Sequence, residues 1–180
     1  MEDLSLHILD LVENSIEAGA SKVEVRLRED LKADRLTIEI DDNGKGMDDE
    51  MLKRALDPFF TTKKVRRVGL GLSLFQQAAL AAGGDFAIQS KPGRGTKLKA
   101  SFQLSHIDRK PLGDMTKTVI TLIVGHPDVR LMYQHRKNGL MQRFDSGALT
   151  EGQDLSSMSV VELVTLVRKH LQVKNKPDSI

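Results

Sequence analysis

Cysteine and tryptophan are absent from this sequence of 180 residues, and tyrosine occurs only once. The absence of cysteine excludes disulfides, thiolate metal sites, iron–sulfur clusters and cysteine nucleophiles. The scarcity of tryptophan and tyrosine argues against a platform on which nucleic-acid bases stack. The five histidines are scattered along the chain without the spacing of metal ligands, so no structural metal site is expected.

A strong excess of one charge and long apolar runs are also missing. Residues 1–104 carry 16 basic and 17 acidic residues, and residues 105–180 carry 11 and 8. Neither part has the basic surplus that binds many duplex phosphates, so no nucleic-acid partner is expected. No apolar stretch approaches the ~20 residues that span a bilayer, and the N-terminus does not read as a signal peptide. We therefore expect a cytoplasmic protein without membrane association.

Short periodic segments of apolar residues are present instead. Hydrophobic residues make up 39% of the chain, enough to bury the core of one domain with a small extension. Apolar residues at helical spacing predict helices over residues 3–18, 49–56 and 69–82. Alternating apolar residues predict strands over 22–27, 36–40, 86–88 and 98–104. The pattern favours an α+β fold, a two-layer sandwich in which helices cover one face of a mixed sheet.

The composition shifts at residues 105–113, where we place a boundary between a domain of residues 1–105 and an extension of residues 106–180. The extension is predicted to contain a helix over 114–125, a hairpin turning at Asn138-Gly139 and a helix over 159–172. Two alternatives stay open for its role. It packs against the first domain, or it forms a surface for a homodimer or for docking a protein partner.

Two polar residues share one face of the first predicted helix. Asp10 and Asn14 are four residues apart and therefore lie on the same side. A carboxylate and an amide in this arrangement could serve a magnesium ion and a water molecule, because Mg²⁺ takes oxygen ligands and keeps several waters. The same pair on its own is more typical of a solvated helix face.

Glycine-rich segments follow at three places. Asp42 ends the second strand and precedes Gly44 and Gly46, so its carboxylate could accept a hydrogen bond from the exocyclic amine of adenine, although Asp-Asn-Gly is also ordinary turn chemistry. The Gly-Leu-Gly-Leu segment of residues 69–72 opens a helix, where free amides attract anions. It matches neither a Walker loop nor a dinucleotide fingerprint. The segment 93–96, Gly-Arg-Gly-Thr, lies in a turn between strands.

These segments occur together and in one order. The chain has an asparagine-bearing helix, a strand ending in Asp-x-Gly-x-Gly, a Thr/Lys loop, Gly-Leu-Gly-Leu at a helix start and Gly-x-Gly-Thr after a strand. Over residues 4–104 it resembles the GHKL superfamily, which includes gyrase, heat-shock chaperones, histidine kinases and MutL. The resemblance implies the ATP-binding Bergerat fold and a site that takes ATP with Mg²⁺.

The resemblance also implies roles for individual residues. Asn14 would coordinate Mg²⁺, Asp42 would bind adenine, and Thr96 would complete the adenine contacts. The segment 57–68 resembles the ATP lid of histidine kinases, with Lys63 near the phosphates. The other residues that the resemblance places at the ATP site are Gly44, Gly46, Met47, Phe60, Thr62, Gly69, Leu70, Gly71 and Leu72.

Two positions depart from the family pattern. Arg67 stands where kinases of this type usually have a glycine. Asp10 stands where MutL-like and gyrase-like members place a glutamate that orients the attacking water. Because aspartate is shorter by one methylene, we expect weak or absent hydrolysis.

The opening segment of residues 4–20 resembles stand-alone bacterial ATP-binding proteins. We expect a signalling or regulatory module. Three hypotheses remain. The chain transfers the γ-phosphoryl group to a protein partner, which would then be a phosphoacceptor. Alternatively, ATP orders the lid and creates a binding surface without chemistry. As a third possibility, the chain is a slow ATPase with Asp10 as the base.

Overall fold

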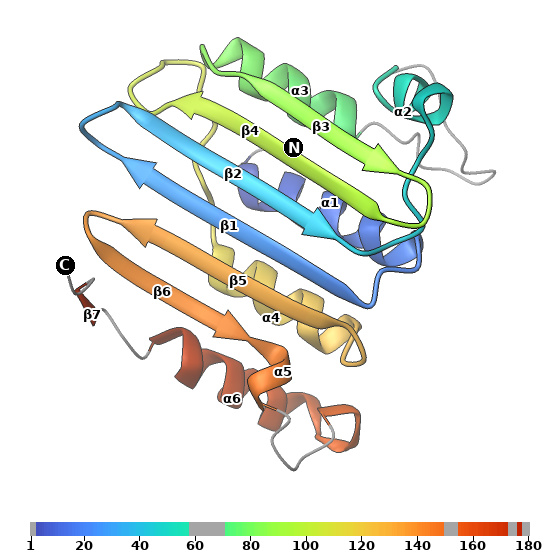
Figure 1. Ribbon diagram of the computed structural model, residues 1–180. Coiled ribbons are helices and arrows are strands. Elements are labelled where there is room, and N and C mark those ends of the chain that lie inside the picture. Colours follow the sequence, from blue (N-terminus) through green and yellow to red (C-terminus); the bar gives the residue numbers. More distant parts are fainter. Residues whose placement is uncertain (1–2, 58–70, 150–154, 173–175, 178–180) are drawn as a thin grey trace.

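The computed structural model describes residues 3–57, 71–149, 155–172 and 176–177. One mixed sheet forms one layer and helices form the other (Figure 1). The strands are β1 (Lys22–Asp30), β2 (Arg35–Asp42), β3 (Phe86–Lys91), β4 (Gly95–Gln103), β5 (Arg130–Lys137), β6 (Leu140–Asp145) and β7 (Lys176–Pro177). The helices are α1 (Leu4–Glu17), α2 (Asp49–Ala55), α3 (Gly71–Ala81), α4 (Met115–Gly125), α5 (Ser146–Leu149), the 3₁₀ turn η1 (Leu155–Ser157) and α6 (Val160–Gln172).

The sheet has seven strands in the order β3-β4-β2-β1-β5-β6-β7. β1 and β5 run parallel, and the other neighbouring pairs are antiparallel. Helix α1 packs between α3 and α4, and α4 packs against α6. The predicted α+β class, with helices on one face of a mixed sheet, is confirmed by this architecture.

The alternation of apolar and polar residues along the strands decides which face of the sheet the helices cover. Val23, Val25 and Leu27 of β1 are buried, and the residues between them face away from the helices because side chains alternate across a strand. That outer face is polar and carries cross-strand ion pairs, such as Glu39 with Lys99 at 3.0 Å. A solvated outer face is what such alternation produces in an antiparallel sheet.

Helix α1 is fixed at its start by its own cap and by a distant segment. The carboxylate of Asp3 accepts a hydrogen bond from the amide of Leu6, as an N-cap residue does. The amides of Leu4 and Ser5 donate to the carbonyl oxygens of Pro111 and Leu112, at 2.9 and 2.8 Å. The segment that precedes α4 thus satisfies the free amides of the helix that carries Asp10 and Asn14.

Residues beyond 106 continue the same sheet. β5 pairs with β1, and α4 packs against α1. Nε2 of His126, at the end of α4, lies 2.8 Å from Oε2 of Glu13 on α1. The extension therefore packs against the first domain, which is one of the two predicted alternatives. The division of the chain at residues 105 and 106, and any dimer or docking surface, stay predictions.

Most predicted elements agree with the structure within a few residues. The predicted turn at Asn138-Gly139 has positive φ at both residues, 52° and 74°, as a type I′ turn requires. β1 and β2 are longer than expected, because the polar residues Arg28–Asp30 still pair with Arg35–Thr37. Of the helix predicted over 69–82, residues 71–81 are helical, and 69–70 lie outside the described residues. No helix in the described ranges is long and apolar enough to cross a membrane.

Candidate nucleotide site

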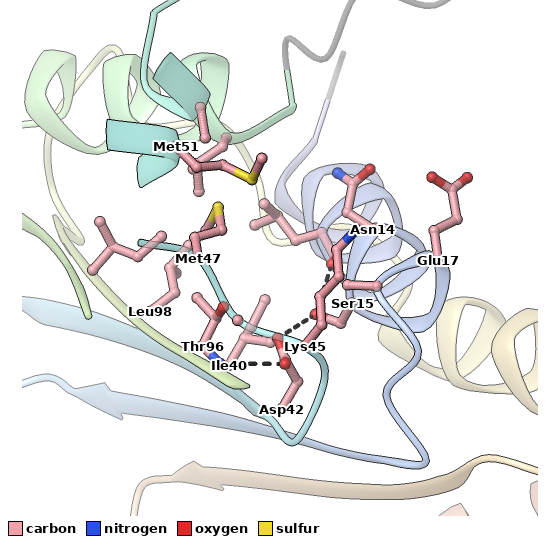
Figure 2. Close-up of a pocket in the computed structure, with 16 residues that line it drawn as sticks. Asn14, Ser15, Glu17, Ile40, Asp42, Lys45, Met47, Met51, Thr96 and Leu98 are labelled. Carbon is pink, nitrogen blue, oxygen red and sulfur yellow. Dashed lines mark hydrogen bonds between the residues drawn. The ribbon is translucent and has the colours of Figure 1, made fainter. Parts of the chain in front are cut away.

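A cavity of about 530 Å³ lies where α1 passes the end of β2 (Figure 2). Its walls come from α1, the loop after β2, α2, the start of α3 and the neighbouring ends of β3 and β4. The lining residues are Leu11, Asn14, Ser15, Glu17, Ala18, Ile40, Asp42, Lys45, Gly46, Met47, Met51, Ala55, Leu72, Ile88, Thr96 and Leu98.

Asp42 stands at the floor of the cavity, where β2 ends. Its Oδ1 accepts hydrogen bonds from the amides of Gly44 at 2.9 Å and Thr96 at 3.3 Å. Its Oδ2 accepts one from Oγ of Ser15 at 2.8 Å. A carboxylate offers about four acceptor positions, so these contacts orient the side chain and leave Oδ2 able to accept from a ligand's N–H group.

Ser90 and Thr96 extend this network along β3 and β4. Oγ of Ser90 accepts from the amide of Met47 at 2.8 Å and donates to the carbonyl of Gly95 at 3.0 Å. It also lies 2.9 Å from Oγ1 of Thr96. Ser90 therefore joins the loop after β2 to the β3–β4 turn and contacts the hydroxyl of Thr96, the residue whose amide donates to Asp42.

Two glycines permit the close approach of these two backbone segments. A Cβ at Gly46 would lie 2.0 Å from the carbonyl oxygen of Lys91, and a Cβ at Gly95 would lie 1.9 Å from that of Asp42. Both glycines have positive φ, 66° and 80°. A side chain at either position would separate the loop from the turn and displace the floor of the cavity.

Apolar side chains form the walls above the carboxylate. Ile40 on β2 and Leu98 on β4 are 4% and 6% exposed and flank the floor. Met47 and Met51 stand at the side of α2 (Figure 2). An apolar slot with one oriented carboxylate at its floor suits a flat aromatic ligand that carries an N–H donor.

Asp10, Asn14 and Gly71 meet at another side of the site, at the start of α3. Nδ2 of Asn14 lies 3.5 Å from Oδ2 of Asp10. A Cβ at Gly71 would lie 1.7 Å from that same oxygen and 3.5 Å from Nδ2 of Asn14. The carboxylate and the amide therefore both face the first residue of an 11-residue helix.

The structure brings together the described residues that the sequence predicted. Six line the cavity: Asn14, Asp42, Gly46, Met47, Leu72 and Thr96. Gly44 supports the carboxylate of Asp42, and Gly71 contacts Asp10 and Asn14. Five predicted residues lie outside the described residues, namely Phe60, Thr62, Lys63, Gly69 and Leu70.

Sequence reasoning missed several lining residues, and Ser15 matters most because it bonds Asp42. A signal was available. Leu11, Asn14, Ser15 and Ala18 repeat at the spacing of one helix face, so a helix that presents Asn14 to the site presents Ser15 as well. Ile40 and Leu98 are each two residues from Asp42 and Thr96 along their strands and therefore share a face with them.

Residues 2–106 match the model of the histidine kinase-, DNA gyrase B-, and HSP90-like ATPase family. That segment is more than half of the chain, which therefore belongs to this family. The sequence resemblance to the GHKL superfamily is confirmed by this match.

Several sensor proteins are similar to the chain. It is 34% identical over 103 residues to a putative sensor protein of Shewanella frigidimarina, covering 56% of this chain and 16% of that protein. It is 37% identical over 89 residues to the histidine-protein kinase AtoS of Escherichia coli, covering 49% and 14%. For the sensor kinase FleS of Pseudomonas aeruginosa the identity is 42% over 89 residues, covering 49% and 22%. The match thus spans less than a quarter of each relative.

The fold is similar to that of the Aquifex aeolicus MutL ATPase domain complexed with ADP. The TM-score is 0.57 at 17% sequence identity, and the likeness covers 94% of this chain and 70% of that one. At this identity the likeness concerns the fold alone. Because it covers 94% of the chain, it extends past residue 106 into the strands that continue the sheet.

Proposed function

We propose that this chain binds ATP together with Mg²⁺ and that it acts as a regulatory module on a protein partner. The observation that carries the proposal is the oriented carboxylate of Asp42 at the floor of an apolar cavity. Oδ2 would accept a hydrogen bond from the exocyclic amine of adenine, and Ile40 and Leu98 would contact the faces of the base. A guanine carries an oxygen at that position and would repel the carboxylate.

Two parts of the site then have separate tasks. We call Asp42, Thr96, Ser90, Gly46 and Gly95 the base end, and Asp10, Asn14 and Gly71 the phosphate end. The N-terminal end of a helix favours anions, and the described part of α3 begins at Gly71, which supports placing the triphosphate there. Bound Mg²⁺ would neutralise phosphate charge, and the side chains of Asn14 and Asp10 offer the oxygen donors that this ion takes.

Phosphoryl transfer to a protein is the activity that we favour among the three hypotheses. Its support is the similarity to the histidine-protein kinase AtoS and the sensor protein kinase FleS, at 37% and 42% identity over 89 residues each. Since such transfer depends mainly on positioning and electrostatics, a site of this kind can serve it without a general base. The phosphoacceptor would be supplied by the partner.

Calorimetric titration with ATP and MgCl₂ tests nucleotide binding. In Asp42→Asn an NH₂ group would replace the Oδ2 acceptor opposite the adenine amine, so two donors would meet. We expect the affinity for ATP to fall about 100-fold, in line with a lost hydrogen bond to a charged group. The matched control is Asp41→Asn, because Asp41 pairs with Lys97 at 3.1 Å on the outer face. Equal affinity of both variants for ATP would contradict the proposed site.

Release of labelled phosphate from γ-labelled ATP separates the activities. We expect little turnover by the isolated chain, because a kinase awaits its acceptor. Appreciable turnover that Asp10→Asn abolishes would instead favour the slow ATPase.

A further inference from the structure

We infer that the outer face of β5 and β6 is a docking surface for an acidic, partly apolar segment of a protein partner. The outer face is the side of the sheet that α1 and α4 leave uncovered (Figure 1). The inference rests on the proposed function and deepens it, because it names the chemistry of the partner on which a regulatory module would act. It concerns a different part of the molecule from the nucleotide site, so the two can be tested separately.

The strand register identifies the residues of this surface. Leu131 and Tyr133 of β5 are buried beneath the helices, at 3% and 1% exposure, so the residues that alternate with them point outward. Met132 of β5 pairs with Asp145 of β6, which places every second residue of β6 on the same face. The outer residues of the two strands are therefore Arg130, Met132, Gln134, Arg136, Met141, Arg143 and Asp145.

The composition of this surface differs from that of the neighbouring strands. The outer basic residues of β3 and β4 are lysines, and Lys97 and Lys99 pair with the carboxylates of Asp41 and Glu39 on β2 at 3.1 and 3.0 Å. On β5 and β6 the outer basic residues are all arginines, two methionines lie among them, and lysine and glutamate do not occur. Arginine and methionine are enriched in protein interfaces, whereas lysine and glutamate are depleted. The lysine-bearing strands thus have the composition of solvated surface, and β5 and β6 have that of an interface.

The charge of this surface is positive. Its one carboxylate, that of Asp145, pairs with Arg130 at 2.8 Å. Arg143 has no ion-pair partner among the residues that the structure describes, and the residue opposite it on β5 is the uncharged Gln134. A guanidinium group presents a fork of N–H donors that matches a carboxylate. Charge complementarity therefore selects an acidic partner, with Arg143 as its main contact.

A hollow of about 350 Å³ lies beside Arg143 and explains why the partner would also be apolar. Met132 of β5, Leu149 of α5 and His170 of α6 are among its lining residues. An apolar side chain of the partner would fill the hollow, while neighbouring carboxylates reach the arginines on either side. A buried anchor with a polar surround is the usual arrangement of a protein interface.

Nucleic acid fits this surface less well than an acidic protein segment. Proteins that bind single strands stack bases on aromatic side chains, and none of the seven outer residues of β5 and β6 is aromatic. The methionines and the hollow would have no counterpart in a phosphate backbone.

Fluorescence anisotropy of a labelled peptide of alternating glutamate and leucine, titrated with the whole chain without nucleotide, measures docking. We expect the peptide to bind, and the affinity to fall as salt rises, because the charges are exposed. Arg143→Glu should weaken binding at least about tenfold, since it sets a carboxylate against the acidic segment. Met132→Gln should weaken binding about fivefold with no change of charge, because it removes an apolar contact at the hollow.

Lys117→Glu is the matched control. Lys117 is exposed in the first turn of α4, in the helical layer, so this variant makes the same change of charge away from the docking surface, and a negative charge near a helix start is favourable. Its affinity for the peptide should equal that of the unchanged chain. Equal losses in Arg143→Glu and Lys117→Glu, or unaltered binding by Met132→Gln, would overturn docking at this surface.

Two further outcomes would also overturn the docking surface: no peptide binding by the unchanged chain, or tighter binding of a labelled oligothymidylate than of the peptide. Neither would touch the nucleotide site, because the anisotropy titration contains no nucleotide. Conversely, peptide binding by a chain that fails to bind ATP in the calorimetric titration would support the docking surface and overturn the proposed nucleotide site alone.

Discussion

The base end and the phosphate end of the cavity differ in the chemistry of their side chains. At the base end, Asp42 accepts three hydrogen bonds from the protein, and Ser90 ties two loops together beneath it. At the phosphate end, Nδ2 of Asn14 lies 3.5 Å from Oδ2 of Asp10. The base end is thus organised before any ligand arrives, whereas the phosphate end combines a carboxylate and an amide, whose oxygens are donors that a divalent cation takes.

Preorganisation lowers the cost of binding, because groups that are already held lose little freedom when a ligand arrives. We therefore expect the base end to supply affinity for the nucleoside part and the phosphate end to supply dependence on metal and on phosphate number. Each of the following substitutions either disrupts one end of the site or distinguishes the contribution of one end from that of the other.

Gly95→Ala should have the largest effect, because it breaks the base end through the backbone. The new Cβ would lie 1.9 Å from the carbonyl of Asp42, at a position where φ is +80°. Neither backbone can move without parting the sheet, so we expect a loss of about 3 kcal/mol in the free energy of unfolding, measured in urea.

Gly93→Ala is the control for that change. Gly93 also has a positive φ, +72°, but its Cβ would meet nothing within 4 Å. The conformational penalty alone should cost about 1 kcal/mol. If both variants lost the same stability, close packing at the base end would not be the reason for the glycine at 95.

His7 lies in the packing between α1 and α3, the two helices that carry the residues of the phosphate end. It lies on α1 against Phe75 of α3 and is 1% exposed, and neither ring nitrogen has a hydrogen-bond partner among the described residues. Burial, with nearby positive charge, lowers the pKa of His7 from 6.5 to about 4. As the pH falls, His7 is therefore protonated in the unfolded chain before it is protonated in the folded one. The stability that the neutral imidazole allows is complete above pH 6.5 and is lost as the pH falls toward 4.

His7→Phe removes this pH dependence and keeps the ring. Relative to the variant, the unchanged chain should lose about 2 kcal/mol of unfolding free energy between pH 7 and pH 5. At pH 7 the two should differ by less than about 1 kcal/mol. Parallel stability curves for the two proteins between pH 7 and 5 would show that His7 is not buried in the neutral form.

Gly71→Ala should separate the two ends. The new Cβ would meet the tip of Asp10, which can rotate away, so stability should change little, because alanine favours a helix. Displacing Asp10 and Asn14 should weaken ATP binding about tenfold with Mn²⁺ present, a cost of the size that overpacking causes. Affinity for adenosine should stay the same. Equal losses for ATP and adenosine would mean that the start of α3 supports the base as well.

Local patterns predicted the elements, and tertiary contacts completed the site. Alternation of Val23, Val25 and Leu27 was enough to identify a strand and its buried face, because burial follows the period of two. The parallel pairing of β1 with β5 joins residues more than 100 positions apart, and no local period reports it. The contact between Asp10 and Gly71 likewise depends on how α1 and α3 pack.

Ser15→Ala should have the smallest effect and should act through the base end alone. It removes the hydrogen bond to Oδ2 of Asp42, while the amides of Gly44 and Thr96 still hold Oδ1. Losing one of three donors should cost about 1 kcal/mol, or about fivefold in affinity. Because Ser15 acts by orienting Asp42 at the base end, titrations with adenosine, ADP and ATP should all shift by the same factor. A loss that grew with phosphate number would show that Ser15 acts through its neighbour Asn14 and that the two ends are coupled along α1.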